Sequence, residues 1–432
     1  MRPILYSSSY PLDRSGKTLV TALLQDLVDQ TARLNGILIL EKGIYLTGPL
    51  FLKSNMELVL EEGSILKATT DETDYPLVFT RVAGIEMPWY PALLNCIGQE
   101  HITIRGNGTI DGSGPYWWEK YWGKDKKGGM RQVYDRQGLR WACDYDCKRL
   151  RNVLIQDSSF ITLKEFTSYQ AGFWNVHLLY SKEIHVNGIQ IRSHSVFAPS
   201  TDGIDVDSCC HVLIENCLTE CHDDSICIKS GRDQDGWRVG RKTADVTIRN
   251  CTILAGFGVT IGSEISGGVE NIHIHHIRFE GSDCGFRIKS SLKRGGYIKN
   301  ISVHDLTMLD VMYPFHFFLD WNRAYSTCML PKDYDSVIPD HWKILLQPAN
   351  MNKTSVENIL IERVEATCSK QSRAFHLVGY PDQRMKNIRL KDCKITCSEF
   401  GILRFVEDLT FSNVSLTITD QNTSSLDEYD QS

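Results

Sequence analysis

The chain has 432 residues and a formal net charge of −6, so it is long enough to bury a large core. A net acidic chain argues against general nucleic-acid binding, which needs a basic surface. No run approaches the ~18 apolar residues of a membrane-spanning helix, and the segment MRPILYSSSYPLDRSGK lacks the apolar core of a signal peptide. We therefore expect no nucleic-acid partner, no membrane partner and a cytoplasmic location. A signal sequence removed beforehand would make the protein secreted or periplasmic. The oligomeric state is not predicted.

One helix is predicted, over residues 17–34. Leu19, Leu23, Leu27 and Leu34 recur at helical spacing there, with further apolar residues beside them. After this segment the chain turns to short alternating strands separated by glycines, beginning GILILEKGIYLTGPLFLKSN.

A strand-sized repeat fills the rest of the chain. Its members carry apolar residues at alternate positions before a polar turn: FITLKEF, EIHVNGI, HVLIENC, DVTIRNC, NIHIHHI, NISVHDL, NILIERV, NIRLKDC and DLTFSNV. Successive members from Ile161 to Ile301 lie about 23 to 34 residues apart, which is typical of one coil of a parallel β-helix. We predict an all-β protein of this class. A β-propeller is the alternative, although its blades run to ~40–50 residues.

The whole chain, 1–432, is then a single β-helix domain. The helix at 17–34 would cap one open end, where exposed strand edges invite aggregation. Residues 321–345 lie in the longest gap between repeats and are predicted to form an inserted loop, and 420–432 to form a polar tail.

Fourteen cysteines are present. Cys217, Cys251 and Cys393 end three similar repeats, which favours a stacked core of small apolar thiols. Cys143 and Cys147 in CDYDC could instead form half of a metal site or a disulfide. No second Cys/His pair with zinc-like spacing accompanies them, so packing is favoured there too.

Three aspartates form the candidate catalytic group. Asp202 lies in STDGIDVDS, and Asp223 and Asp224 lie in CHDDSICIKSG. Asp223 follows Asp202 by 21 residues, or about one coil. Neighbouring rungs are ~4.8 Å apart, so the carboxyl groups can lie roughly 5–10 Å from each other. Inverting glycosidases hold two carboxyl groups ~6.5–9.5 Å apart around a water. Each aspartate alone is also ordinary turn chemistry.

A basic pair follows on a later coil. Arg287 and Lys289 in GFRIKS are two residues apart on a strand and so face the same side. Arginine matches a carboxylate with a fork of donors and lysine adds a point charge. Carboxylates beside such a pair favour an acidic sugar as the substrate.

Together these motifs resemble glycoside hydrolase family 28, the polygalacturonases and their relatives. The resemblance extends from LTGPLFLKSN to about NISVHDL and includes CIKSG and VTIGSEISGG. The family's four motifs, Asn-Thr-Asp, Asp-Asp, Gly-His-Gly and Arg-Ile-Lys, correspond to Ser200-Thr201-Asp202, Asp223-Asp224, Gly256-Phe257-Gly258 and Arg287-Ile288-Lys289.

The resemblance implies a right-handed parallel β-helix and inverting hydrolysis of α-galacturonosyl linkages in pectic oligosaccharides. By that analogy Asp223 is the general acid, while Asp202 and Asp224 activate the water. Arg287 and Lys289 would bind the galacturonate carboxylate. No metal and no cofactor are implied. Crowded carboxyls cannot all ionise easily, so one is expected to keep its proton near neutral pH.

Two motif positions depart from the family pattern. Ser200 replaces an asparagine. Phe257 replaces the motif histidine, so Asp223 must be tuned in another way, by His222 or by desolvation. The rhamnogalacturonan-cleaving branch also lacks this histidine, whereas the retained Arg-Ile-Lys motif favours a polygalacturonase. The linkage therefore stays open between homogalacturonan and rhamnogalacturonan.

Further candidates are weighed against simple packing. Trp174 and His177 could line the cleft one coil before Asp202, and Asp205 could orient a neighbour. Glu264 could bind substrate or end a strand. Tyr313 is a candidate cleft tyrosine, and Asp207 is an aspartate beside the cluster. Four tryptophans could stack on sugars or pack in a lid: Trp117, Trp118, Trp122 and Trp141.

Competing functions remain. A pectate lyase would use calcium on clustered carboxylates and could take Lys289 as its base. A non-catalytic β-helix would bind glycans without turnover. If the segments 115–125 and 321–345 wall off one end of the cleft, the enzyme is exo-acting and releases single residues.

Overall fold

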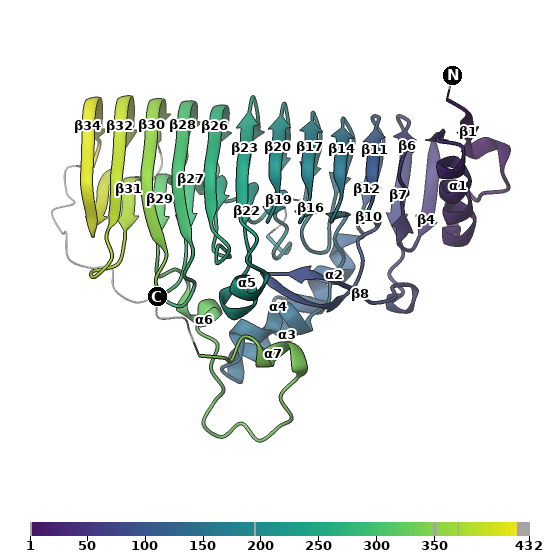
Figure 1. Ribbon diagram of the computed structural model, residues 1–432, viewed down its shortest axis with the longest axis horizontal. Helices are drawn as coiled ribbons and strands as arrows, with labels where there is room; N and C mark the ends of the chain where they lie inside the picture. The colour runs from purple at the N-terminus through teal and green to yellow at the C-terminus, as the bar shows by residue number, and fades with distance from the viewer. Residues whose placement is uncertain (1, 194–195, 349–351, 370, 421–432) are drawn as a thin grey trace.

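The computed structural model describes residues 2–193, 196–348, 352–369 and 371–420. The chain winds into a stack of coils that forms a right-handed parallel β-helix, with the N-terminal helix at one end and β34 at the other (Figure 1). The fold class predicted from the repeat is therefore confirmed, and the propeller is wrong.

An eleven-stranded sheet runs along one wall of the stack, and every strand pair in it is parallel. Its strands are β5 (Leu50–Phe51), β10 (Leu94–Ile97), β13 (Val153–Gln156), β16 (Val176–Leu179), β19 (Ile204–Asp207), β22 (Ile226–Lys229), β25 (Val259–Ile261), β27 (Cys284–Lys289), β29 (Tyr313–Phe318), β31 (Arg373–Val378) and β33 (Glu399–Arg404). Side chains alternate along each strand. Ile204 and Val206 of β19 thus enter the core, while Asp205 and Asp207 lie on the outer face.

A 21-stranded parallel sheet forms the other walls. Its strands are β1 (Ile4–Tyr6), β2 (Ser15–Leu19), β3 (Ile37–Leu40), β4 (Gly43–Thr47), β6 (Glu57–Leu60), β7 (Ser64–Ala68), β11 (Glu100–Arg105), β12 (Thr109–Asp111), β14 (Ser159–Lys164), β15 (Thr167–Tyr169), β17 (Lys182–Asn187), β18 (Gln190–Arg192), β20 (Cys210–Glu215), β21 (Leu218–Glu220), β23 (Thr243–Arg249), β24 (Thr252–Ile253), β26 (Val269–Glu280), β28 (Tyr297–Leu309), β30 (Ser355–Thr367), β32 (Met385–Cys397) and β34 (Val406–Ile418).

One continuous apolar core runs from Leu5 to Cys397 inside the stack. The asparagines that open several repeats have a separate role at its surface. Asn271, Asn300, Asn358 and Asn387 have positive φ, a conformation that asparagine tolerates better than most residues. Their amides donate from coil to coil over 2.6–3.3 Å and so form a ladder along the sheet.

Helix α1 (Thr21–Arg33) covers the first coil, within the range predicted from sequence. The predicted apolar positions are confirmed in part. Leu27 is buried against the core with Leu24 and Val28, whereas Leu23 and Leu34 are exposed. Residues 15–19 belong to strand β2, so the helix starts later than expected.

Several elements outside the coils were not predicted. They lie on one side of the solenoid (Figure 1). They comprise the antiparallel hairpin β8 (Val78–Val82) and β9 (Ile85–Trp89), α2 (Gly114–Trp122), α3 (Met130–Arg136), α4 (Arg140–Asp146), α5 (Asp233–Val239), α6 (Arg323–Ser326) and α7 (Asp340–Lys343). Short 3₁₀ turns occupy Ser7–Ser9 and Glu72–Asp74. The segment 321–345 thus contains two short helices, and of the tail only Asp420 lies within the described residues.

No helix of the described chain has both the length and the apolar character needed to cross a bilayer. All fourteen cysteines lie among the described residues and carry free thiols. Cys143 and Cys147 are buried against Tyr121 as free thiols, so they pack in the interior and form no disulfide. Cys217, Cys251 and Cys393 are buried in the stacked core.

Candidate active site

The aspartates lie in the turns that precede β19 and β22. Ile204 and Ile226 are register partners, and Asp202 and Asp224 each lie two residues before them. One coil is therefore 22 residues long here, and Asp224, not Asp223, is the equivalent of Asp202. Asn175 on the preceding coil fixes the turn, because its side-chain amide donates to the Asp202 carbonyl over 3.0 Å.

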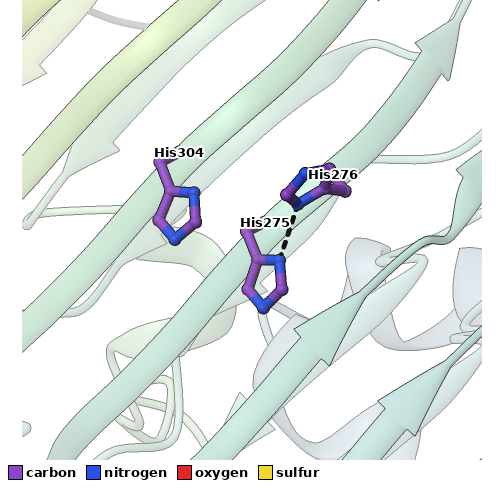
Figure 2. A group of neighbouring side chains, drawn as sticks. All are labelled: His275, His276 and His304. Carbon is purple, nitrogen blue, oxygen red and sulfur yellow. Dashed lines mark hydrogen bonds between the residues drawn. The ribbon is translucent and has the colours of Figure 1, made fainter.

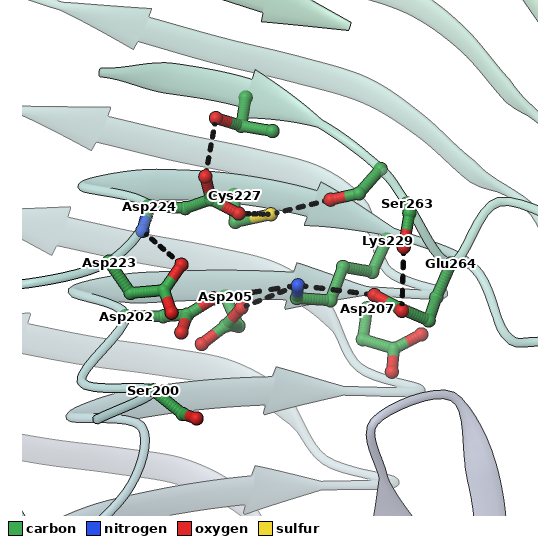
Figure 3. Close-up of polar contacts among 12 residues, drawn as sticks. Ser200, Asp202, Asp205, Asp207, Asp223, Asp224, Cys227, Lys229, Ser263 and Glu264 are labelled. Carbon is green, nitrogen blue, oxygen red and sulfur yellow. Dashed lines mark hydrogen bonds and ion pairs between the residues drawn. The ribbon is translucent and has the colours of Figure 1, made fainter. Parts of the chain in front are cut away.

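The three carboxylates converge on one point (Figure 3). Asp202, Asp223 and Asp224 each offer an oxygen within 4.8 Å of the others. Closest oxygens lie nearer together than carboxyl centres do, so this spacing does not by itself give the ~6.5–9.5 Å separation of an inverting pair. Asp202 and Asp224 are buried, and Asp223 is the most accessible of the three.

Asp224 is held as an anion by the basic pair. Its carboxylate accepts from Lys289 Nζ at 2.6 Å and from Arg287 Nη1 at 3.4 Å, and Thr260 Oγ1 donates to it over 2.8 Å. Burial alone would raise the pKa of Asp224, but Lys289 and Arg287 outweigh it and lower that pKa. The two bases thus stabilise a carboxylate of the site itself. Their contact with a substrate carboxylate stays a prediction.

The pKa values of Asp202 and Asp223 shift in the opposite direction from that of Asp224. Burial and the neighbouring Asp223 raise the pKa of Asp202 well above its usual range. Burial followed by the charge of Asp224 raises the pKa of Asp223. Protons in such a cluster belong to the group of carboxyls rather than to one residue. Burial and mutual repulsion thus favour a retained proton on this cluster, which is the condition that a general acid requires.

Lys229, at the end of β22, is central to the site and was not singled out by sequence. Its ammonium is buried and lies 3.5 Å from Asp202, 3.6 Å from Asp205 and 3.4 Å from Glu264 (Figure 3). Burial opposes its charge, but Cys227 and these carboxylates raise the pKa of Lys229 well above the ordinary value. The sequence signal was present, since the lysine of CIKSG follows alternating apolar residues and so shares the outer face of the strand with the acidic row.

A small pocket opens above the cluster, with a volume of about 80 Å³. Its described lining includes Asp202, Asp223, Lys229, Glu264 and Lys289, together with residues that sequence did not predict: Ala83, Arg140, Asp144, Phe173, Ser263, Trp321 and Tyr325. The Trp321 ring lies 4.5 Å from Lys289 Nζ, within cation–π range, and lines the pocket. Arg140 adds a positive charge to those of Lys229 and Lys289 at the pocket and is paired with Asp144 at 2.7 Å.

The outlying elements form the wall of this pocket. The hairpin β8–β9, helix α4 and the α7 segment share a second apolar core with Phe173 and Trp174. Tyr145 of α4 donates to the Ala83 carbonyl over 2.9 Å and accepts from Arg232 at 2.7 Å. The wall is therefore fixed to the coils by a shared apolar core and by hydrogen bonds.

The predicted aromatic candidates divide into two groups. Trp174 lines the pocket, with its ring 5.0 Å from Lys229 Nζ. His177 is fully buried behind it, accepting from Arg151 at 2.7 Å, so a direct place in the cleft is wrong for this residue. Burial lowers the pKa of His177 to about 4. The sugar-stacking role was also wrong for three tryptophans whose side chains are buried. Trp117 packs in the main core, Trp141 packs in the second core, and the indole of Trp118 donates to the Ala171 carbonyl over 2.9 Å.

Other predicted residues support the site rather than form its centre. Glu264 is buried and ion-paired with Lys229, and the positive charges around it overcome burial to lower its pKa. Asp207 pairs with Arg81 at 2.8 Å. The His222 backbone N–H donates to Thr201 Oγ1 over 3.2 Å. Tyr313 packs against His316 and lies outside the described pocket lining.

The structure also shows where the two departures from the family pattern, Phe257 and Ser200, lie. The Phe257 ring lies 4.9 Å from the Arg287 guanidinium, and its backbone N–H donates to the Asp223 carbonyl over 3.0 Å. Burial is the largest influence on the pKa of Asp223, which favours the desolvation explanation of its tuning. Ser200 has a positive φ of 52° and lies at the pocket edge.

Metal ligation is conceivable at two overlapping groups, Asp202–Asp223–Asp224 and Asp202–Asp205–Cys227. Two lysine ammoniums already compensate the negative charge of these groups. Lys229 pairs with Asp202 and Asp205, and Lys289 pairs with Asp224. A site compensated by its own cations suits acid–base chemistry on a sugar better than Ca²⁺ binding, which needs an excess of oxygen ligands.

Comparison with known proteins identifies the class. The model of glycosyl hydrolases family 28 matches residues 92–328, which include both aspartate turns, Lys229 and the basic pair. The chain belongs to this family. The resemblance to the family is thereby confirmed.

Individual relatives show how far the similarity extends. A probable polygalacturonase from Vitis vinifera is 31% identical over 312 residues, 69% of this chain and 60% of the relative. An endo-polygalacturonase from Pectobacterium parmentieri is 25% identical over 284 residues, 63% of this chain and 64% of the relative. The match thus spans about three fifths of these relatives. The exopolygalacturonase of Thermotoga maritima has the same fold, with a TM-score of 0.82 at 24% identity over 96% of this chain and 92% of that one.

Proposed function

We propose that this protein is an inverting hydrolase that removes galacturonic acid from the end of pectin-derived oligogalacturonides. The observation that carries the proposal is the carboxylate cluster, in which Lys289 and Arg287 hold Asp224 anionic while burial and repulsion raise the pKa of Asp223. An acid and a base at one point are the two groups that glycoside hydrolysis requires.

Each carboxyl has a distinct part in this reaction. Asp223 is the most accessible of the three and donates its proton to the leaving glycosidic oxygen. Asp224 and Asp202 accept hydrogen from the attacking water, which adds to the anomeric carbon as the glycosidic bond breaks. Burial is the main cause of the raised pKa of Asp202, and a proton on Asp223 removes the next largest, while the ammonium of Lys229 at 3.5 Å favours the ionised form. The carboxylates also stabilise the positive charge that develops on the sugar ring.

Exo action is supported by the shape of the pocket. Its volume of about 80 Å³ is far below the ~300–1,000 Å³ of sites for larger ligands. The wall formed by the hairpin, α4 and the insert closes one side with a shared apolar core. A narrow pocket with a packed wall suits a chain end better than the middle of a polymer.

The second candidate is hydrolysis of a rhamnogalacturonan linkage by the same carboxyls. Phe257, in place of the motif histidine, favours it, because its ring presents an apolar face beside Arg287. The retained basic pair favours an all-galacturonate substrate, and the three basic residues that line the pocket, Arg140, Lys229 and Lys289, suit an anionic sugar.

The proposal is tested by digesting a defined oligogalacturonide and a rhamnogalacturonan oligosaccharide in parallel and analysing products from the first minutes. We expect free galacturonic acid from the first substrate, and Asp223→Asn to lose ~10²–10⁴-fold in kcat. A ladder of intermediate sizes would refute exo action. Cleavage of the rhamnogalacturonan alone would establish rhamnogalacturonan hydrolysis, the second candidate function. Full activity of Asp223→Asn would refute the assignment of Asp223 as the general acid.

A further inference from the structure

Three histidines meet on the outer surface of the 21-stranded sheet, on the wall that does not carry the aspartates. His275 and His276 lie on β26 and His304 on the next strand, β28 (Figure 2). His275 and His304 are partly exposed and His276 is exposed. Nothing in the proposed hydrolysis uses them.

Their arrangement follows from the coil register. His275 and His304 are direct partners on neighbouring strands, so their rings stack 4.8 Å apart with an angle of 5° between them. His276 has a positive φ of 55°, which turns its ring back toward His275. The Nδ1 atoms of these two residues are 2.8 Å apart. One nitrogen from each ring lies within 4.8 Å of the others.

A second layer orients the third imidazole. His304 Nδ1 donates to Asp305 over 2.6 Å, which leaves Nε2 of that ring as its metal-binding atom. Arg363 fixes the same carboxylate with two bonds of 2.7 and 3.0 Å. A carboxylate behind a ligating histidine sets its tautomer and raises its basicity, as in many metal sites.

The surroundings admit a cation. Arg249 precedes His275 in the register, but its charge is compensated by Glu215 at 2.7 Å. An open groove of about 610 Å³ passes beside the cluster, with His276 and Asp305 in its lining, so the site is reached from solvent.

We propose that His275, His276 and His304 form a surface site for a borderline divalent transition metal such as Zn²⁺, Ni²⁺ or Co²⁺. Imidazole nitrogens suit these ions, whereas Ca²⁺ and Mg²⁺ prefer oxygen. Bound nitrogens lie ~2.0–2.1 Å from zinc, so two ligands can be at most about 4.2 Å apart. Rotation of these partly exposed rings closes the remaining distance, and water completes the coordination.

The site would join two adjacent coils without taking part in the hydrolysis. Metal that binds the folded chain and not the unfolded one raises thermal stability in proportion to the logarithm of its concentration above Kd. Sugar cleavage would be unchanged, because the ligands belong to a different sheet from the carboxylates.

The test is calorimetric titration of the untagged, chelator-treated full chain with Zn²⁺ and, separately, Ni²⁺. We expect one ion per chain, a rise in melting temperature with added metal, and unchanged sugar cleavage. His276→Ala and His304→Ala should each weaken binding at least 10-fold. Asp305→Asn should weaken it about 10-fold through the lost support of His304. His273→Ala, an exposed histidine of the same strand, is the matched control and should bind as the wild type does.

The Co²⁺ spectrum of the unmutated protein gives an answer that does not depend on how the variants fold. Weak d–d bands without thiolate charge transfer are expected for nitrogen and oxygen ligands. Thiolate bands would place the metal on a cysteine and overturn the proposal. So would the absence of stoichiometric binding, or equal affinity in His304→Ala and His273→Ala.

Discussion

Replacing Lys289 with methionine tests the ion pair that holds Asp224 anionic. The ammonium is 2.6 Å from the carboxylate, and the two side chains are 5% and 0% exposed, so solvent screens the pair little. Breaking a buried pair from one side typically costs about 3–5 kcal/mol, because the remaining charge is left buried. Arg287 stays at 3.4 Å, so we expect the lower end, about 3 kcal/mol at pH 7.

The sign of the pH effect follows from the pKa of Asp224. Lys289 lowers this pKa in the folded protein, so the pair contributes stability above the unfolded value of ~3.9, and that stability is lost as pH falls through the folded pKa. In Lys289→Met the pKa of Asp224 should rise, because burial is then opposed by fewer positive charges. The acid limb of the kcat/KM profile should then move to higher pH, because the base is protonated earlier.

The assays are urea denaturation at pH 7 and a pH profile of kcat/KM on an oligogalacturonide. Lys299→Met is the matched control, since its ammonium pairs with Glu270 at 3.3 Å on the surface and its loss should cost under ~1 kcal/mol. A Lys289→Met protein with the stability and the acid limb of the wild type would refute the reasoning. A change in KM alone would assign Lys289 to substrate rather than to Asp224.

Three further outcomes follow from the site. Burial raises the pKa of Asp205 well above its unfolded value, so the folded state binds an extra proton and the free energy of unfolding falls as pH rises between the two pKa values. Asp205→Asn should flatten this fall when denaturation curves are measured across pH. An unchanged dependence of stability on pH would contradict the prediction. Tyr145→Phe removes the hydroxyl that joins Ala83 and Arg232 and should cost about 1–3 kcal/mol in urea melts; an unaltered midpoint would mean that the wall is not fastened there. Activity should survive exhaustive chelation, because Lys229 and Lys289 supply the positive charge among the carboxylates; loss on chelation and recovery with Ca²⁺ would favour a lyase.

The coil, and the convergence of the aspartates on it, could be predicted because both depend on local patterns. Alternating apolar residues fix which side chains enter the core, and a repeat of about one coil places equivalent positions side by side. The spacing was nevertheless one residue off, since the register of Ile204 with Ile226 makes Asp224 the position equivalent to Asp202. Turns vary in length, so register is set by hydrogen bonds that a residue count does not include.

The pocket wall could not be predicted in the same way. Arg140, Trp321 and Tyr325 come from segments with no repeat, and they reach the site through a second core shared by distant parts of the chain. The buried tryptophans were ambiguous for a related reason, because a large aromatic in a loop packs or stacks on sugar according to what covers it. The exposed Leu23 of α1 shows that helical spacing alone leaves the buried face uncertain by about a quarter turn.

The central claim is that the carboxylate cluster hydrolyses a galacturonosyl bond with water. The most direct measurement is digestion of an oligogalacturonide in water labelled with heavy oxygen, with mass spectrometry of the product and NMR of its anomeric configuration at early times. The account predicts one labelled oxygen at the new reducing end, with inverted configuration, and none of this product from Asp223→Asn. An unlabelled, unsaturated product would contradict it and identify a lyase.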